Sequence, residues 1–249
     1  MEIRIEISGK DASRILMLMI LIGLLLTLIY LAGPLLDVPV RLRRLFDVGR
    51  EASIPTWIAT SQLLITGICF LLLAENSHRR GGFSSIFFPL VGIGFVFLSM
   101  DEASGIHESI TALLQGVEFL PRFNDGHGIW IMIYIAIALG LAFYVRDDIR
   151  IMFDGYRRET FILATGMALF LAGGIGVEVL GYSIIHDGTN AQLDRLQNAS
   201  EEFLELIGIS TVLYAVLLLG VRFRQQRDLQ TTFAKQPPLL NSGRLFGSQ

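Results

Sequence analysis

The sequence is poor in charge and has a single cysteine. Asp, Glu, Lys and Arg make up 17% of its 249 residues, against about 25% in an ordinary soluble domain. Together with a hydrophobic content of 52%, this deficit indicates a chain that lies in lipid. Cys69 can form no internal disulfide, so cysteine usage indicates no redox compartment. The net charge is −3 and no basic stripe carries interleaved aromatic residues, so we expect no nucleic-acid partner.

Six apolar segments are each long enough to cross a hydrocarbon core of roughly 30 Å at ~1.5 Å per residue. They are Ile15–Leu36, Trp57–Ala74, Phe83–Met100, Ile129–Val145, Phe161–Ile185 and Phe203–Val221. We therefore expect an all-α, polytopic membrane bundle of about six transmembrane helices. The chain divides into a cytoplasmic N-terminal segment (1–14), the transmembrane domain (15–222) and a flexible cytoplasmic tail (223–249).

The ends of the apolar segments predict the orientation. No small-x-small cleavage site follows the first segment, which is too long for a signal peptide, so we expect it to remain as a span. Most of the 20 Lys and Arg residues fall on the same side as the two termini, which predicts cytoplasmic termini in a bacterial inner membrane. The exception is VRLRRLFDVGRE (40–51), which is typical of a short amphipathic helix whose arginines contact lipid phosphates.

Acidic residues gather at one end of this predicted bundle. The stretch LSMDEASGIHES (98–109) follows a long uncharged run, and the topology places it beside the external ends of the fifth and sixth spans. The predicted metal ligands on this periplasmic side are Asp101, His107, Glu108, Glu178, Glu201 and Glu205. The predicted supporting residues are Asp47, Arg50, Glu51, Glu102, Ser104, His186 and Glu202.

Helical spacing sharpens this prediction. If the third helix continues past the membrane boundary, one stripe carries Asp101, Ser104, Glu108, Thr111 and Gln115. His107 would then flank the stripe and Glu102 would point elsewhere. A carboxylate-rich set with one imidazole suits iron, manganese, calcium or magnesium better than zinc, which favours His and Cys.

Some of these residues also have structural interpretations. Glu201 and Glu202 follow Asn198 and Ser200, which are N-cap residue types, and acids are favoured in a first helical turn. Arg50 could neutralise the acidic residues through a salt bridge. Glu178 and Glu205 lie within spans, where a charge costs roughly 2.5–3.5 kcal/mol, so a functional role is the default. The glycines around Glu178 would let another helix approach closely; they are Gly173, Gly174, Gly176 and Gly181.

Four motifs together resemble those of a group of bacterial multi-helix membrane proteins with no established activity. They are FDVGRE with the following PTW (46–57), DEASGIHE (101–108), GVEVLG (176–181) and EEFLELIG (201–208). The resemblance implies that the acidic residues and His107 form one set, but it implies no reaction.

Three functions are compatible with these patterns. The first is a membrane metalloprotein, such as a metal-dependent oxidoreductase or hydrolase acting on a lipid or quinone-like substrate, although the two-ExxH signature of soluble diiron bundles is absent. The second is a cation- or proton-coupled transporter or channel that uses Glu178 and Glu205. The third is an accessory subunit whose acids bind a partner membrane subunit or a structural ion.

Overall fold

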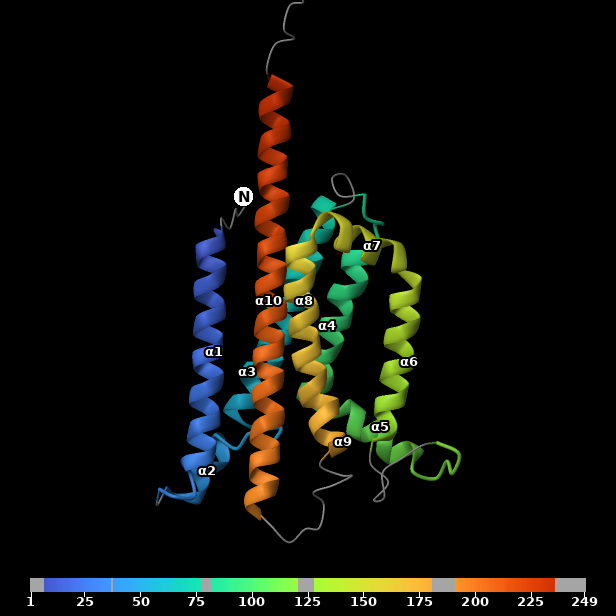
Figure 1. The fold of residues 1–249 in the computed structure, drawn as a ribbon. Coiled ribbons are helices and arrows are strands. Elements are labelled where there is room, and N and C mark those ends of the chain that lie inside the picture. Colours follow the sequence, from blue (N-terminus) through green and yellow to red (C-terminus); the bar gives the residue numbers. More distant parts are fainter. Residues whose placement is uncertain (1–6, 37, 78–81, 121–127, 181–190, 236–249) are drawn as a thin grey trace, which may run out of the picture.

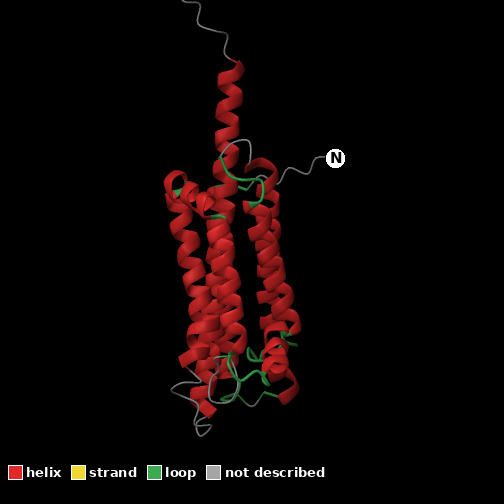
Figure 2. Ribbon diagram, turned by 90° about the vertical axis from the view of Figure 1, so that its right-hand side faces the viewer, coloured by secondary structure: helices red, strands yellow, loops and turns green. Residues whose placement is uncertain are grey.

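A computed structural model describes residues 7–36, 38–77, 82–120, 128–180 and 191–235, which contain helices and no strand (Figures 1 and 2). In chain order the elements are α1 (Gly9–Ala32), α2 (Val40–Leu45), α3 (Ile54–Ser77), α4 (Phe87–Ser104), α5 (Ile106–Leu114), α6 (Ile129–Tyr144), α7 (Arg146–Gly155), α8 (Arg157–Leu171), the π-helix η1 (Ala172–Val177), α9 (Glu178–Leu180) and α10 (Ala191–Lys235).

The helices confirm the predicted class of fold. Within the described residues, 5 helices are long and apolar enough to cross a membrane. A further candidate is the pair α6 and α7, which is bent by 69° at its junction and would bring the number to 6. The chain is therefore a helical, multi-pass membrane protein. The predicted amphipathic helix of the first loop is α2, whose apolar side chains Val40, Leu42 and Leu45 are exposed.

Two predicted boundaries differ from the structure. The third span was predicted from Phe83, but α4 begins at Phe87. The backbone N–H and hydroxyl of Ser84 donate hydrogen bonds to the Asp148 carboxylate at 2.6 and 2.7 Å, which hold residue 84 outside the helix. The flexible tail was predicted from residue 223, but α10 continues to Lys235.

Helix α10 is the axis around which the bundle is organised. Its 45 residues give it a length of about 67 Å, roughly twice the hydrocarbon core. Its C-terminal part extends well beyond the other helices, on the side where α1 begins (Figure 1). The predicted sixth span is only the central part of this helix, because polar residues at both ends continue the same helical geometry.

Glycines set the closest helix contacts. A Cβ atom at Gly166 in α8 would lie 2.7 Å from the backbone nitrogen of Val212 in α10, and one at Gly67 in α3 would lie 2.8 Å from the carbonyl oxygen of Gly92 in α4. Small residues of this kind allow backbones to approach closely within a membrane. Gly173 and Gly174 also contact α10, as predicted, whereas Gly181 lies outside the described residues.

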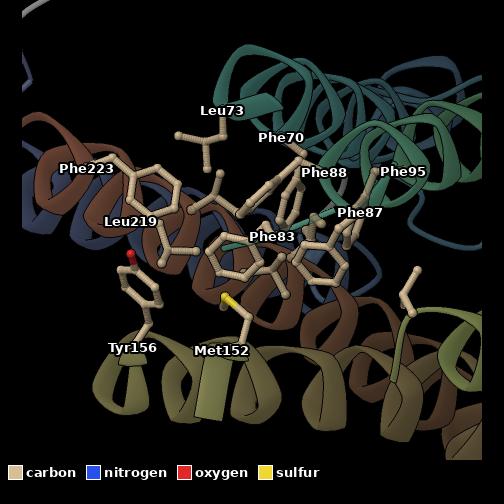
Figure 3. Packing of buried hydrophobic residues seen from close by; sticks show 14 of the residues in the cluster. Phe70, Leu73, Phe83, Phe87, Phe88, Phe95, Met152, Tyr156, Leu219 and Phe223 are labelled. Atoms are coloured by element: carbon tan, nitrogen blue, oxygen red, sulfur yellow. The ribbon is translucent and has the colours of Figure 1, made fainter. Parts of the chain in front are cut away.

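An aromatic core fills the bundle at the end where α7 crosses it (Figure 3). Phe83 stacks on Phe87 with ring centroids 5.6 Å apart and meets Phe88 edge-on at 5.0 Å. Tyr156 and Phe223 pack against the same rings. Because these side chains are buried and almost entirely apolar, they fill much of this end of the bundle.

Candidate functional site

The site is built on a break between α4 and α5 at the opposite end of the bundle. Gly105 ends α4 with a φ of 56°, the left-handed conformation that favours glycine. The third helix therefore does not continue through this point, and the stripe from Asp101 to Gln115, which depended on its continuing, does not form. The break turns α5 so that His107 and Glu108 fold back towards the end of α4.

Asp101 ties the two helices together. Its buried carboxylate accepts a hydrogen bond from the backbone N–H of His107 at 2.8 Å, which caps the first turn of α5. The same oxygen, Oδ1, lies 3.2 Å from Nδ1 of the His107 ring. Because a carboxylate only accepts, Nδ1 carries the proton and Nε2 remains available to another group.

The charge around His107 is strongly negative. Burial lowers the pKa of His107, but the hydrogen bond from its ring to Asp101 and the charges of Asp101, Glu102 and Glu108 raise it, and the net effect is a raised pKa. The acids therefore favour a positive charge at this position. The imidazolium form carries that charge when no metal is bound, and a metal cation that binds Nε2 displaces the Nε2 proton.

Three more carboxylates surround this pair. A Cβ atom at Gly105 would lie 2.5 Å from Oε1 of Glu51 and 3.6 Å from Oε2 of Glu108, so both carboxylates lie over the same glycine. The charge of Glu102 interacts with those of Asp101, His107, Glu51 and Glu108. Glu102 thus lies among these ionisable side chains. In a continuous helix it was expected to point away from them.

Glu202 adds a carboxylate from α10. It interacts electrostatically with Glu102 of α4, and its Oε2 atom is buried without a hydrogen-bond partner among the described residues. The interpretation of Glu201 and Glu202 as first-turn acids is wrong, because α10 begins at Ala191. We call the group of Glu51, Asp101, Glu102, His107, Glu108 and Glu202 the carboxylate–histidine cluster.

Aromatic residues of α6 cover one side of this cluster. The Trp130 ring lies over His107 with centroids 5.0 Å apart and meets Tyr134 edge-on at 5.2 Å. The Tyr134 hydroxyl is buried near Asp101. The sequence analysis assigned no role in the site to either residue; the signal in the sequence was the position of Trp130 at the start of an apolar segment on the same side as the acids.

Glu205 faces a different neighbour, whereas the carboxylate of Glu201 interacts electrostatically with that of Glu202. A Cβ atom at Gly174 would lie 2.7 Å from Oε1 of Glu205, and one at Gly173 would lie 2.7 Å from the carbonyl oxygen of Glu201. Glu205 therefore packs against the π-helix η1. Glu178 begins α9, directly after η1, but its side chain and the whole of His186 lie outside the described residues.

Three predicted supporting residues are not part of the cluster. Ser104 is exposed at the end of α4. Asp47 and Arg50 line a separate cavity with Arg43, Arg44 and Arg195. Among the described residues no salt bridge joins Arg50 to the cluster, so its predicted neutralising role is not observed.

The cluster is accessible but is not arranged as a coordination sphere. Within the part of the chain that the structure describes, no three His, Cys, Asp or Glu side chains are positioned to hold a metal ion. A hollow of about 370 Å³ opens beside Glu51, lined in part by the apolar side chains of Leu45, Ile54, Trp57 and Ala103. Of the cluster residues, Glu51 lines this hollow, so a small molecule bound there would contact the Glu51 side chain.

Fold and site together define a multi-pass helical membrane protein with an acidic, histidine-containing cluster at one end of its bundle. Residues 16–219 match the family model described as Domain of unknown function (DUF8692), and the chain belongs to this family. The match covers most of the chain and all of the cluster. No curated protein and no solved structure matches the chain.

Proposed function

We propose that this protein binds a divalent cation through the carboxylate–histidine cluster at one face of the membrane, which we take to be the periplasmic face of a bacterial inner membrane. The observation that carries the proposal is the hydrogen bond between Asp101 and Nδ1 of His107. Histidines that ligate metals almost always donate their other ring N–H to such an acceptor, which fixes the tautomer and leaves Nε2 for the ion.

The surrounding carboxylates support this proposal. Glu51 and Glu108 are exposed and lie over Gly105, so rotation of their side chains would bring oxygens towards His107. Glu202 contributes a buried oxygen that has no hydrogen-bond partner among the described residues. Oxygen ligands with one imidazole favour iron, manganese, calcium or magnesium.

The proposal is tested by titrating chelator-treated, detergent-purified protein with Mn²⁺. We expect stoichiometric binding and a rise in the unfolding temperature, because an ion at one hundred times its Kd stabilises the folded state by about 2.7 kcal/mol. His107→Ala and Glu108→Gln should weaken binding at least tenfold. The control Glu118→Gln, an exposed acid beyond α5, should not. If Mn²⁺, Fe²⁺, Ca²⁺ and Mg²⁺ all fail to bind, the proposal is wrong.

A second candidate, proton binding, is favoured by the interaction of Glu102 with Glu202. Two neighbouring carboxylates that are partly buried repel each other unless they share a proton or a cation. If Glu102 and Glu202 bind a proton and no metal, the pH dependence of the unfolding temperature should be the same in EDTA as in Mn²⁺. The variant Glu202→Gln should then lose much of that pH dependence.

The position of the aromatic core helps to distinguish transport from a function at one face of the membrane. The core fills much of the end of the bundle opposite the cluster with apolar side chains, and the buried acids there, Asp148 and Glu159, are already paired with Ser84 and Arg222. Both observations argue against a polar path through the protein. We therefore favour a function confined to one face, such as hydrolysis or oxidation of a lipid or quinone-like molecule, over transport. Adding such substrates to Mn²⁺- or Fe²⁺-loaded protein tests this, with His107→Ala as the inactive control.

A role as an accessory subunit would appear as co-purification of a partner membrane protein.

A further inference from the structure

A second site lies beside the carboxylate–histidine cluster, at the same end of the bundle. The end of α1, helix α2 and the loop that follows it enclose a cavity of about 570 Å³, and Arg195 of α10 completes it. Figure 1 shows α2 lying across the end of α1. This volume is in the range of pockets that bind small molecules.

The charge of the cavity is positive. Among the described residues, its lining contains four arginines, Arg43, Arg44, Arg50 and Arg195, and one acid, Asp47. Among the described residues none of these arginines forms a salt bridge. A positive charge that its neighbours leave unbalanced favours an anionic ligand.

Two of the arginines also have unused hydrogen-bond donors. The Nε atoms of Arg43 and Arg195 are buried and have no hydrogen-bond partner in the described part of the chain. Both side chains are held in place by packing: the Arg195 guanidinium lies 4.6 Å from the centre of the Tyr30 ring, and a Cβ atom at Gly33 would contact Cδ of Arg43 at 3.6 Å. Buried donors without acceptors are costly, and a phosphate that drew either guanidinium group into the cavity would satisfy them.

The remainder of the lining is apolar. It is formed by side chains of α1 and α2 and by the residues between them, and includes Leu28, Ile29, Leu36 and Leu42. Because α1 is a candidate membrane span and α2 exposes apolar side chains, the cavity lies where a membrane surface meets the protein. A free phosphate ion would use the arginines but not this apolar wall.

We propose that this cavity binds an anionic phospholipid, with the phosphate between Arg43 and Arg195 and an acyl chain along α1. The site is distinct from the cation site proposed above, and its residues do not overlap with the cluster. The lipid would join α1 and α2 to the N-terminal part of α10, which carries both Arg195 and Glu202.

The experiment is native mass spectrometry of the full-length protein with phosphatidylglycerol, phosphatidylcholine of the same acyl chains, or inorganic phosphate. We expect one phosphatidylglycerol to be retained per chain, at least tenfold more strongly than phosphatidylcholine, and no displacement by millimolar phosphate. Arg43→Gln and Arg44→Gln should each reduce retention several-fold, and Arg195→Gln should do the same if the protein folds. The matched control Arg41→Gln changes an exposed arginine of α2 outside the cavity lining and should have no effect.

Three results would overturn the proposal. They are equal retention of both lipids, an equal loss in Arg41→Gln and Arg43→Gln, and displacement by inorganic phosphate, which would indicate a phosphate site instead. The variant His107→Ala should retain phosphatidylglycerol normally, so failure of the cation site leaves this result unchanged.

Discussion

Asp101 accepts hydrogen bonds from both the backbone N–H and the ring Nδ1 of His107, at 2.8 and 3.2 Å. One carboxylate thus begins α5 and orients the imidazole. Asp101 therefore has a structural role, as the cap of α5, and also holds the His107 ring within the cluster.

The first prediction concerns the break at Gly105. Gly105→Ala should destabilise the protein by about 1–2 kcal/mol, because other residues are strained in the left-handed conformation and because the new Cβ would lie 2.5 Å from Oε1 of Glu51. Thermal unfolding in detergent measures this. Gly94→Ala in α4 is the control, since a Cβ there meets nothing within 4 Å. Equal unfolding temperatures for the two variants would contradict the described geometry.

The second prediction is a pH dependence carried by His107. Its pKa is raised in the folded protein, so its protonated form contributes stability that is fully present below the unfolded value of about 6.5 and is lost as pH rises through the folded pKa. The difference in unfolding temperature between the wild type and His107→Gln should therefore shrink from pH 5.5 to pH 8.5. In the Asp101→Asn variant, NMR titration should give His107 a lower midpoint. An unchanged midpoint would remove Asp101 as a cause.

The third prediction tests the contact between α8 and α10. Gly166→Ala should cost about 1–3 kcal/mol from overpacking, because its Cβ would lie 2.7 Å from the backbone nitrogen of Val212 and 2.8 Å from the carbonyl oxygen of Gly208. Gly140→Ala in α6 provides the comparison, since its Cβ has open space. That substitution should be neutral or slightly stabilising. A neutral Gly166→Ala would mean that the helices are further apart than described.

The fourth prediction fixes the orientation in the membrane. In a Cys69→Ser background, a cysteine at Glu118, beyond α5, should react with an impermeant thiol reagent added to intact cells. A cysteine at Asp154 in α7 should not. Both positions are exposed, and α5 and α7 lie at opposite ends of the bundle (Figure 1). The reverse pattern of labelling would place the cluster in the cytoplasm.

The sequence by itself determined the class of the protein and the side on which its acids gather. Long apolar segments leave a helical bundle as the consistent choice in lipid, because backbone hydrogen bonds must be satisfied internally. Short connections then place alternate segment ends at the same face, so residues as distant as Glu51, Asp101 and Glu202 could be grouped without any knowledge of packing.

Only the tertiary structure decided which of these acids meet. A single φ of 56° at Gly105 ends the helix that spacing alone would continue, and it brings His107 back to Asp101. The early start of α10 at Ala191 makes Glu202 an interior helical residue instead of a first-turn acid, and the small glycines of η1 let Glu205 pack against η1. Helical periodicity describes one helix at a time, whereas breaks, rotations and close approaches depend on contacts between helices, and these determine which side chains form a site.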